Sequence, residues 1–162
     1  MKVYIETYGC TANQGDSQGI RNAIIASGGA MVERPEEADV IIVNTCAVTE
    51  PTSRSMVKAI RRYKNKKVIV AGCMAAAQPY LLEGHAECAS APGADAVARM
   101  LGIRPAEGVP LLKCRTAIIP IAGGCAGRCS YCIVRLVRGP LRSVPPSTVV
   151  ASVKKALDMG AK

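Results

Sequence analysis

The chain has 162 residues, 49% of them hydrophobic, with eight cysteines and a net charge of +9, which suits one domain of ordinary size or one domain and part of another. No apolar run is long enough to span a membrane, and the first residues, MKVYIETYG, lack the apolar core of a signal peptide, so we expect a cytoplasmic protein without a membrane partner. In such a reducing compartment, eight cysteines indicate metal or redox chemistry rather than a disulfide framework.

Short runs of β-branched residues alternate with helical segments through the first hundred residues. Strands that alternate with helices are typical of a parallel sheet covered by helices on both faces. The predicted fold class is therefore α/β, with a doubly wound parallel sheet. The predicted strands are 2–8, 39–45 and 67–72, and the predicted helices are 16–29, 51–63, 74–84 (broken at Pro79) and 94–102.

The segment 102–110, GIRPAEGVP, contains two prolines and two glycines and predicts a domain boundary. We expect a first domain over 1–107 and a second over 113–162. The second contains a predicted strand at 114–123, a loop with three cysteines and a predicted helix at 146–162. One strand–loop–helix unit cannot close a sheet, so we expect a larger domain that is truncated after this first unit.

The positive charge is concentrated in this second segment. Residues 1–112 carry 12 Lys/Arg and 11 Asp/Glu, whereas residues 113–162 carry 9 Lys/Arg and a single acid, Asp158. A basic segment attached to a neutral one favours a polyanionic partner, most simply nucleic acid. A basic face that is merely solvated would give the same composition. The same alternatives apply to the basic run KAIRRYKNKK at 58–67.

A cysteine follows each of the three predicted strands. Cys10, Cys46 and Cys73 lie just past the strands 2–8, 39–45 and 67–72. The carboxyl ends of parallel strands meet at one edge of the sheet, and open α/β sheets bind ligands at that edge. We therefore expect these three thiols to point into one pocket. The alternative is that each is a small, buried and inert side chain.

A second set of cysteines is local. The stretch GGCAGRCSYCIV (123–134) contains Cys125, Cys129 and Cys132 at the spacing C-x3-C-x2-C. Zinc would need a fourth Cys or His ligand, and the single histidine of the sequence, His85, lies about forty residues away. Iron–sulfur clusters are held by cysteine thiolates, usually four. Three thiolates on a four-iron cluster would leave one iron free to bind a substrate.

The C-x3-C-x2-C spacing with Tyr131 before the last cysteine resembles the radical S-adenosylmethionine enzymes. The resemblance implies that the free iron binds the amino and carboxylate groups of S-adenosylmethionine. It also implies that the cluster, once reduced by an electron donor, cleaves this cofactor to a 5′-deoxyadenosyl radical. Tyr131 is then expected to bind the cofactor by packing near its adenine.

Further motifs narrow this resemblance to the methylthiotransferases, over essentially the whole chain. They are ETYGCTANQGDS (6–17), NTCAV (44–48), VAGCMA (70–75) and GCAGRCSYCIVRLVRGPLRSVP (124–145). The resemblance implies two [4Fe–4S] clusters. Cys125, Cys129 and Cys132 would hold the radical cluster, and Cys10, Cys46 and Cys73 an auxiliary cluster that supplies the inserted sulfur. The segment MAAAQ after Cys73 departs from the family's shorter C-x-A-Q spacing.

Family members modify either a tRNA adenosine next to the anticodon or a ribosomal-protein aspartate. Arg135 stands where the forms that act on isopentenyl-adenosine tend to have proline, so the chain looks more like the archaeal and eukaryotic branch. That branch acts on N6-threonylcarbamoyladenosine, which makes the anticodon stem-loop of tRNA the expected partner. We expect the fragment alone to be inactive, because the rest of the barrel and an RNA-binding domain are missing.

Other readings remain open at this point. The same chemistry could act on isopentenyl-adenosine or on a ribosomal-protein aspartate, and a non-catalytic iron–sulfur module or a zinc-binding RNA module are rivals of another class. Cys88 and Cys114 match no ligand of the family and are predicted to be ordinary thiols. Asn13, Asp16 and Ser17 match the family's first motif, and they are also residue types that commonly cap a helix N-terminus. Arg138 and Arg142 are predicted as phosphate contacts or structural ion pairs.

Overall fold

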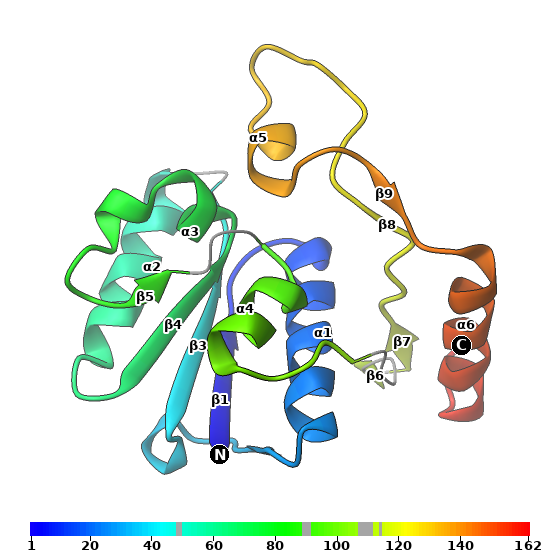
Figure 1. The fold of residues 1–162 in the computed structure, drawn as a ribbon, viewed down its shortest axis with the longest axis horizontal. Helices are drawn as coiled ribbons and strands as arrows, with labels where there is room; N and C mark the ends of the chain where they lie inside the picture. The colour runs from blue at the N-terminus through cyan, green and yellow to red at the C-terminus, as the bar shows by residue number, and fades with distance from the viewer. Residues whose placement is uncertain (48–49, 89–91, 107–111, 114) are drawn as a thin grey trace.

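The computed structural model describes residues 1–47, 50–88, 92–106, 112–113 and 115–162. Within this part of the chain, five strands form one parallel sheet in the order β2-β1-β3-β4-β5 (Figure 1). The three predicted strands are confirmed as β1, β3 and β4. The strands β2 and β5 were not predicted, because two residues show no alternation. The bounds are β1 Lys2–Thr7, β2 Ala30–Met31, β3 Val40–Thr45, β4 Lys67–Gly72 and β5 Glu87–Cys88.

Helices connect these strands in the positions that the sequence indicates. The helix predicted at 16–29 begins earlier, at Thr11, so Asn13, Asp16 and Ser17 lie inside it and do not cap it. The segment 74–84 is divided, as Pro79 suggests, into a short α-helix and a 3-10 turn. The bounds are α1 Thr11–Ala26, η1 Pro35–Glu37, α2 Glu50–Arg62, α3 Cys73–Ala77, η2 Pro79–Leu81 and α4 Ala94–Leu101.

Hydrophobic side chains pack on both faces of the sheet. On one face α1 and α4 cover alternate strand residues, including Val3 and Ile42, with Ile24 and Val97 among the helix side chains. On the opposite face α2 covers the other strand residues, which are buried with Met56 and Ile60. Burying one such side chain stabilises the fold by about 1.5–3 kcal/mol. The arrangement confirms the predicted doubly wound α/β fold.

The register of the central strands places their carboxyl ends at one level. Thr7 is paired with Asn44, Asn44 with Ala71, and Thr45 with Gly72. Cys46 and Cys73 therefore come directly after the paired residues Thr45 and Gly72. Cys10 lies three residues after the end of β1. The strand order also reverses between β1 and β3, and such a switch point is where open sheets of this kind bind ligands.

The rest of the described chain forms smaller elements. In the antiparallel pairs, β6 (Leu112–Lys113) lies next to β7 (Thr116–Ala117), and β8 (Ala122–Gly123) next to β9 (Arg142–Ser143). The continuous strand predicted at 114–123 is therefore wrong. Pro120 lies between β7 and β8 and has no N–H for a strand ladder.

The cysteine triplet lies in the loop after β8, above the carboxyl-terminal edge of the sheet (Figure 1). The helix α5 (Val134–Arg138), which was not predicted, follows this loop. The last predicted helix is confirmed as α6 (Pro146–Asp158). Its side chains Val150 and Leu157 are 52% and 57% exposed. Among the described residues, no helix is both long and apolar enough to cross a membrane.

Candidate functional site

A glycine with positive φ comes directly before Cys10 and before Cys73, and neither position has room for a side chain. A Cβ on Gly9, with φ of 121°, would lie 2.9 Å from the Cβ of Cys46. A Cβ on Gly72, with φ of 87°, would overlap the carbonyl oxygen of Thr45. Glycine avoids both the collision and the conformational strain. The loops that carry Cys10 and Cys73 therefore pack against the end of β3, next to Cys46.

A buried amide network joins these loops. Asn13 and Asn44 are fully buried. Asn13 Nδ2 donates hydrogen bonds to Asn44 Oδ1 (3.2 Å) and to the carbonyl of Thr45 (2.7 Å). Asn44 Nδ2 donates to the carbonyl of Asn13 (2.7 Å) and to Ser17 Oγ (2.9 Å). Buried amides are costly without such partners, so Asn13 and Ser17 fix α1 against β3 rather than cap the helix.

The thiols of this first set differ in burial. Cys10 is exposed, Cys46 is buried and Cys73 is half-buried. Burial raises the pKa of the Cys73 thiol, Arg138 opposes that rise in pKa, and the nearby Cys46 and Asp16 add to it. Cys46 and Cys73 follow the paired residues Thr45 and Gly72. The Cys10 thiol donates a hydrogen bond to Asn13 Oδ1, at 3.4 Å.

The three cysteines of the triplet line a pocket of about 550 Å³, together with Gly127 and Arg135. The backbone N–H of Gly127 donates a hydrogen bond to Cys125 Sγ at 3.3 Å. A Cβ on Gly127 would lie 3.3 Å from Cys125 Sγ and 3.9 Å from Cys129 Sγ. Arg135 Nη1 donates to the carbonyls of Ala126 (3.4 Å) and Gly127 (3.2 Å). The loop is thus wrapped around the thiols by its own backbone and by Arg135.

The donor set fits an iron–sulfur cluster in kind, because thiolates are the ligands of such clusters. The residues Cys10, Cys46, Cys73, Cys125, Cys129 and Cys132 are free thiols. Among the described residues, no three Cys, His, Asp or Glu side chains are gathered closely enough to hold a single metal ion. In a cubane cluster each thiolate binds a different iron, so its ligands stand farther apart than those of one ion.

The structure places the remaining predicted residues as follows. Tyr131 is 89% exposed, and its contact with an adenine stays a prediction. Arg138 forms an ion pair with Asp16, as one of its two predicted roles requires. The predictions for Cys88 and Cys114 concern side chains outside the described residues. Sequence reasoning missed the amide network and the loop contacts of Arg135, although the motifs that contain them were recognised.

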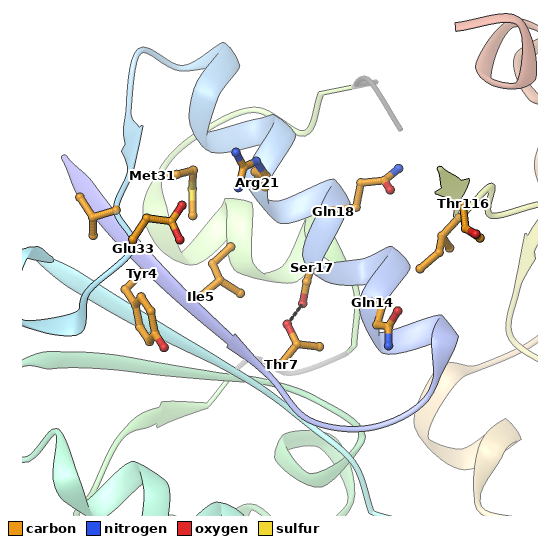
Figure 2. A pocket seen from close by; sticks show the side chains of 12 residues that line it. Tyr4, Ile5, Thr7, Gln14, Ser17, Gln18, Arg21, Met31, Glu33 and Thr116 are labelled. Carbon is orange, nitrogen blue, oxygen red and sulfur yellow. Dashed lines mark hydrogen bonds between the residues drawn. The ribbon is translucent and has the colours of Figure 1, made fainter. Parts of the chain in front are cut away.

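A separate pocket of about 610 Å³ lies beside β1, under α1 (Figure 2). β2 pairs with β1 only at Lys2 and Val3, which leaves Tyr4, Ile5 and Thr7 of β1 to line the pocket. In Figure 2 the hydroxyls of Thr7 and Ser17 are joined by a hydrogen bond of 2.8 Å. This pocket therefore shares Ser17 with the amide network, but its lining contains none of the described cysteines.

Comparisons with known proteins identify the relatives of the chain. Residues 2–91 match the family described as "Uncharacterized protein family UPF0004". The chain is 32% identical to the "Probable threonylcarbamoyladenosine tRNA methylthiotransferase" of Pyrococcus horikoshii, over 100% of the chain and 43% of the relative. It is 36% identical to the protein with the same name from Methanocaldococcus jannaschii, over 100% and 42%. It is also 30% identical to the "Ribosomal protein uS12 methylthiotransferase RimO" of Desulfosudis oleivorans, over 100% and 44%. The chain spans less than half the length of these relatives.

Proposed function

The chain belongs to the family UPF0004, and from this premise we propose that it is part of an enzyme that methylthiolates N6-threonylcarbamoyladenosine next to the anticodon of tRNA. The observation that carries this proposal is the identity of 32% and 36% to archaeal relatives of that name, over the whole chain. Arg135 supports the same substrate from the sequence alone. A ribosomal-protein substrate is the second candidate, favoured by the 30% identity to the uS12 methylthiotransferase.

The cysteine sets are proposed to hold the cofactors. Cys125, Cys129 and Cys132 would bind one [4Fe–4S] cluster with S-adenosylmethionine, and Cys10, Cys46 and Cys73 would bind another. When bound, these groups would supply the radical cleavage of S-adenosylmethionine and the sulfur to be inserted, with electrons from a separate donor. Gly127 and Arg135 would shape the triplet loop around the thiols, and Tyr131 would lie beside the adenine.

The domain division follows from the same proposal. Residues 1–107 would form the domain of the auxiliary cluster, and residues 113–162 would begin the radical S-adenosylmethionine domain. The exposure of Val150, Val153 and Leu157 on α6 supports this, because a following element of a barrel would cover these apolar side chains. A cytoplasmic location would suit a tRNA substrate.

The function can be tested in cells of the source organism. Deleting the gene should remove the methylthio group from threonylcarbamoyladenosine in tRNA and leave the threonylcarbamoyl group in place. The measurement is mass spectrometry of nucleosides from purified tRNA. The full-length gene and a Cys114→Ala variant should restore the modification, and Cys10→Ala and Cys125→Ala variants should not. An unchanged nucleoside profile in the deletion strain would refute the proposed substrate.

RNA binding should depend on salt, because residues 113–162 carry 9 Lys/Arg against one acid. Neutralising phosphates releases counterions, and six or more contacts cost about 10³-fold in affinity between about 50 and 200 mM salt. For this chain we expect weak binding to tRNA, with little sequence preference, that falls at least about tenfold over that range. Filter binding or fluorescence anisotropy at several salt concentrations would measure it.

A matched pair of variants tests where the charge acts. Replacing Arg142 and Lys155 by glutamine should reduce the slope of affinity against salt. Replacing Lys66 and Lys67 by glutamine removes the same charge. However, Lys66 Nζ already donates a hydrogen bond to the carbonyl of Ala38 (2.9 Å), and Lys67 Nζ lies 3.8 Å from the Glu87 carboxylate. That second variant should keep the slope. Binding that ignores salt would contradict the electrostatic account.

A further inference from the structure

The side chain of Arg138 reaches from the end of α5 to the carboxyl-terminal edge of the sheet. Its Nη2 lies 2.8 Å from Asp16 Oδ2 and 3.3 Å from Asn13 Oδ1. The positive charge of Arg138 also opposes the rise in the pKa of the Cys73 thiol. Asp16 and Asn13 lie in α1, and Cys73 begins α3, which is itself in contact with α5 (Figure 1). The Arg138 side chain thus joins the helix after the triplet to α1, while α5 itself contacts the helix that begins at Cys73.

These contacts are shielded from water. The side chains of Arg138 and Asp16 are 16% and 18% exposed. Burial raises the pKa of the Asp16 carboxyl above its ordinary value, although Arg138 acts in the opposite direction. Removing one partner of a desolvated pair leaves the other charge without compensation, which is strongly destabilising locally. The pair therefore couples the placement of α5 to that of α1.

Arg138 also completes the bonding of Asn13. The Asn13 amide donates to Asn44 and Thr45, and its Oδ1 accepts from the Cys10 thiol and from Arg138. A side-chain amide has two donor hydrogens and two acceptor lone pairs, so these contacts use its full capacity. Arg138 therefore shares the acceptor Asn13 Oδ1 with the thiol of Cys10.

Arg135, one turn earlier on α5, has a different set of partners. It bonds back to the carbonyls of Ala126 and Gly127, within the triplet loop itself (residues 124–133). The two arginines thus bond to different parts of the chain. Arg135 bonds within the triplet loop, and Arg138 attaches the helix that follows this loop to α1. A packing contact accompanies the attachment, because Pro120 and Ile118 lie over Gly15, next to Asp16.

We propose that Arg138 is a positioning residue that fixes the triplet loop above the carboxyl-terminal edge of the sheet and thereby sets the separation of the two cysteine sets. The proposal rests on the proposed function, in which sulfur held at one set must reach a substrate activated at the other. Beyond the proposed function, it identifies Arg138 as the side chain that keeps the two cysteine sets at a fixed separation. The geometry itself is formed by side chains of this chain, so it can be tested without iron.

The test is amide hydrogen exchange of the iron-free, full-length protein, resolved by mass spectrometry. In Arg138→Gln, exchange should accelerate about tenfold or more in residues 124–139 and also in residues 11–18, with β3 and β4 unchanged. Arg135→Gln removes the same charge and should accelerate exchange in 124–133 while 11–18 stay protected. Arg138→Lys should give an intermediate result, because an ammonium can pair with Asp16 but lacks the rigid planar guanidinium that also bonds to Asn13.

Asp16→Asn breaks the same pair from the other side and serves if Arg138→Gln does not fold. In the iron-loaded protein, magnetic coupling between the two reduced clusters should weaken in Arg138→Gln at unchanged iron content.

Unchanged exchange in residues 11–18 would overturn the positioning role even if iron content and activity support the proposed function. Global loss of protection in both variants would also overturn it, because the pair would then maintain the fold rather than place the loop. A protein that binds no iron but shows the expected exchange would refute the proposed function alone.

Discussion

Replacing Cys125 by alanine in the full-length protein is expected to remove about half of its cluster iron and to abolish cleavage of S-adenosylmethionine. Two [4Fe–4S] clusters hold about eight irons per chain, and each set supplies three thiolates. Without one of the three, the triplet cannot retain its cluster, while the strand-end set is unaffected. Iron analysis after anaerobic reconstitution and the yield of 5′-deoxyadenosine measure the two effects.

Matched cysteine variants separate the two sites. Cys10→Ala should also lower the iron content, but it should spare the cleavage of S-adenosylmethionine and stop sulfur insertion. Cys114→Ala makes the same chemical change in the basic segment, outside both sets, and should keep the full iron content. If Cys125→Ala retains all its iron, the triplet is not a cluster site.

Replacing Gly72 by alanine is expected to destabilise the fold severely, by about 3 kcal/mol or more. The new Cβ would overlap the carbonyl oxygen of Thr45 and lie 2.5 Å from Asn44 Oδ1. Both neighbours are fully buried, and Asn44 belongs to the amide network, so neither can move aside without losing hydrogen bonds. Urea denaturation of the iron-free protein, followed by circular dichroism, gives the change in the free energy of unfolding.

Gly84 provides a control that has a positive φ but no close neighbour, whereas the ψ of −167° at Gly72 adds strain of its own. Gly84 has φ of 73°, similar to the 87° of Gly72, but a Cβ at Gly84 would meet no heavy atom within 4 Å. Gly84→Ala should therefore cost only about 1–2 kcal/mol, the penalty of a left-handed conformation for a residue with a Cβ. Equal losses in the two variants would show that the close packing of Gly72 on β3 has no special role.

The three long strands of the sheet could be predicted because each is encoded by a short, continuous run of residues. The runs that form β1, β3 and β4 are apolar and β-branched, and each is followed by a helical pattern. Their carboxyl ends then place Cys10, Cys46 and Cys73 at one edge without any knowledge of side-chain contacts. The two-residue strands β2 and β5 could not be found in this way, because they exist only through pairing with neighbours that are distant in sequence.

The details of the site depend on contacts between distant segments, which one sequence does not reveal. Asn13, Asp16 and Ser17 are common at helix N-termini, yet α1 begins before them and their side chains bond to β3 and α5 instead. Gly15 lies within α1, at a position where Pro120 packs closely. The partner of Arg138 lies 122 residues away, so its role became visible only in the fold.

The central claim is the choice of substrate, and a competition assay tests it most directly. The full-length, reconstituted enzyme would receive S-adenosylmethionine, a reductant and equal amounts of three substrates: tRNA with threonylcarbamoyladenosine, tRNA with isopentenyl-adenosine, and ribosomal protein uS12. Mass spectrometry of nucleosides and peptides then follows the methylthio group. We expect it on threonylcarbamoyladenosine ahead of the other two substrates. Faster modification of isopentenyl-adenosine or of uS12 would contradict the proposed function.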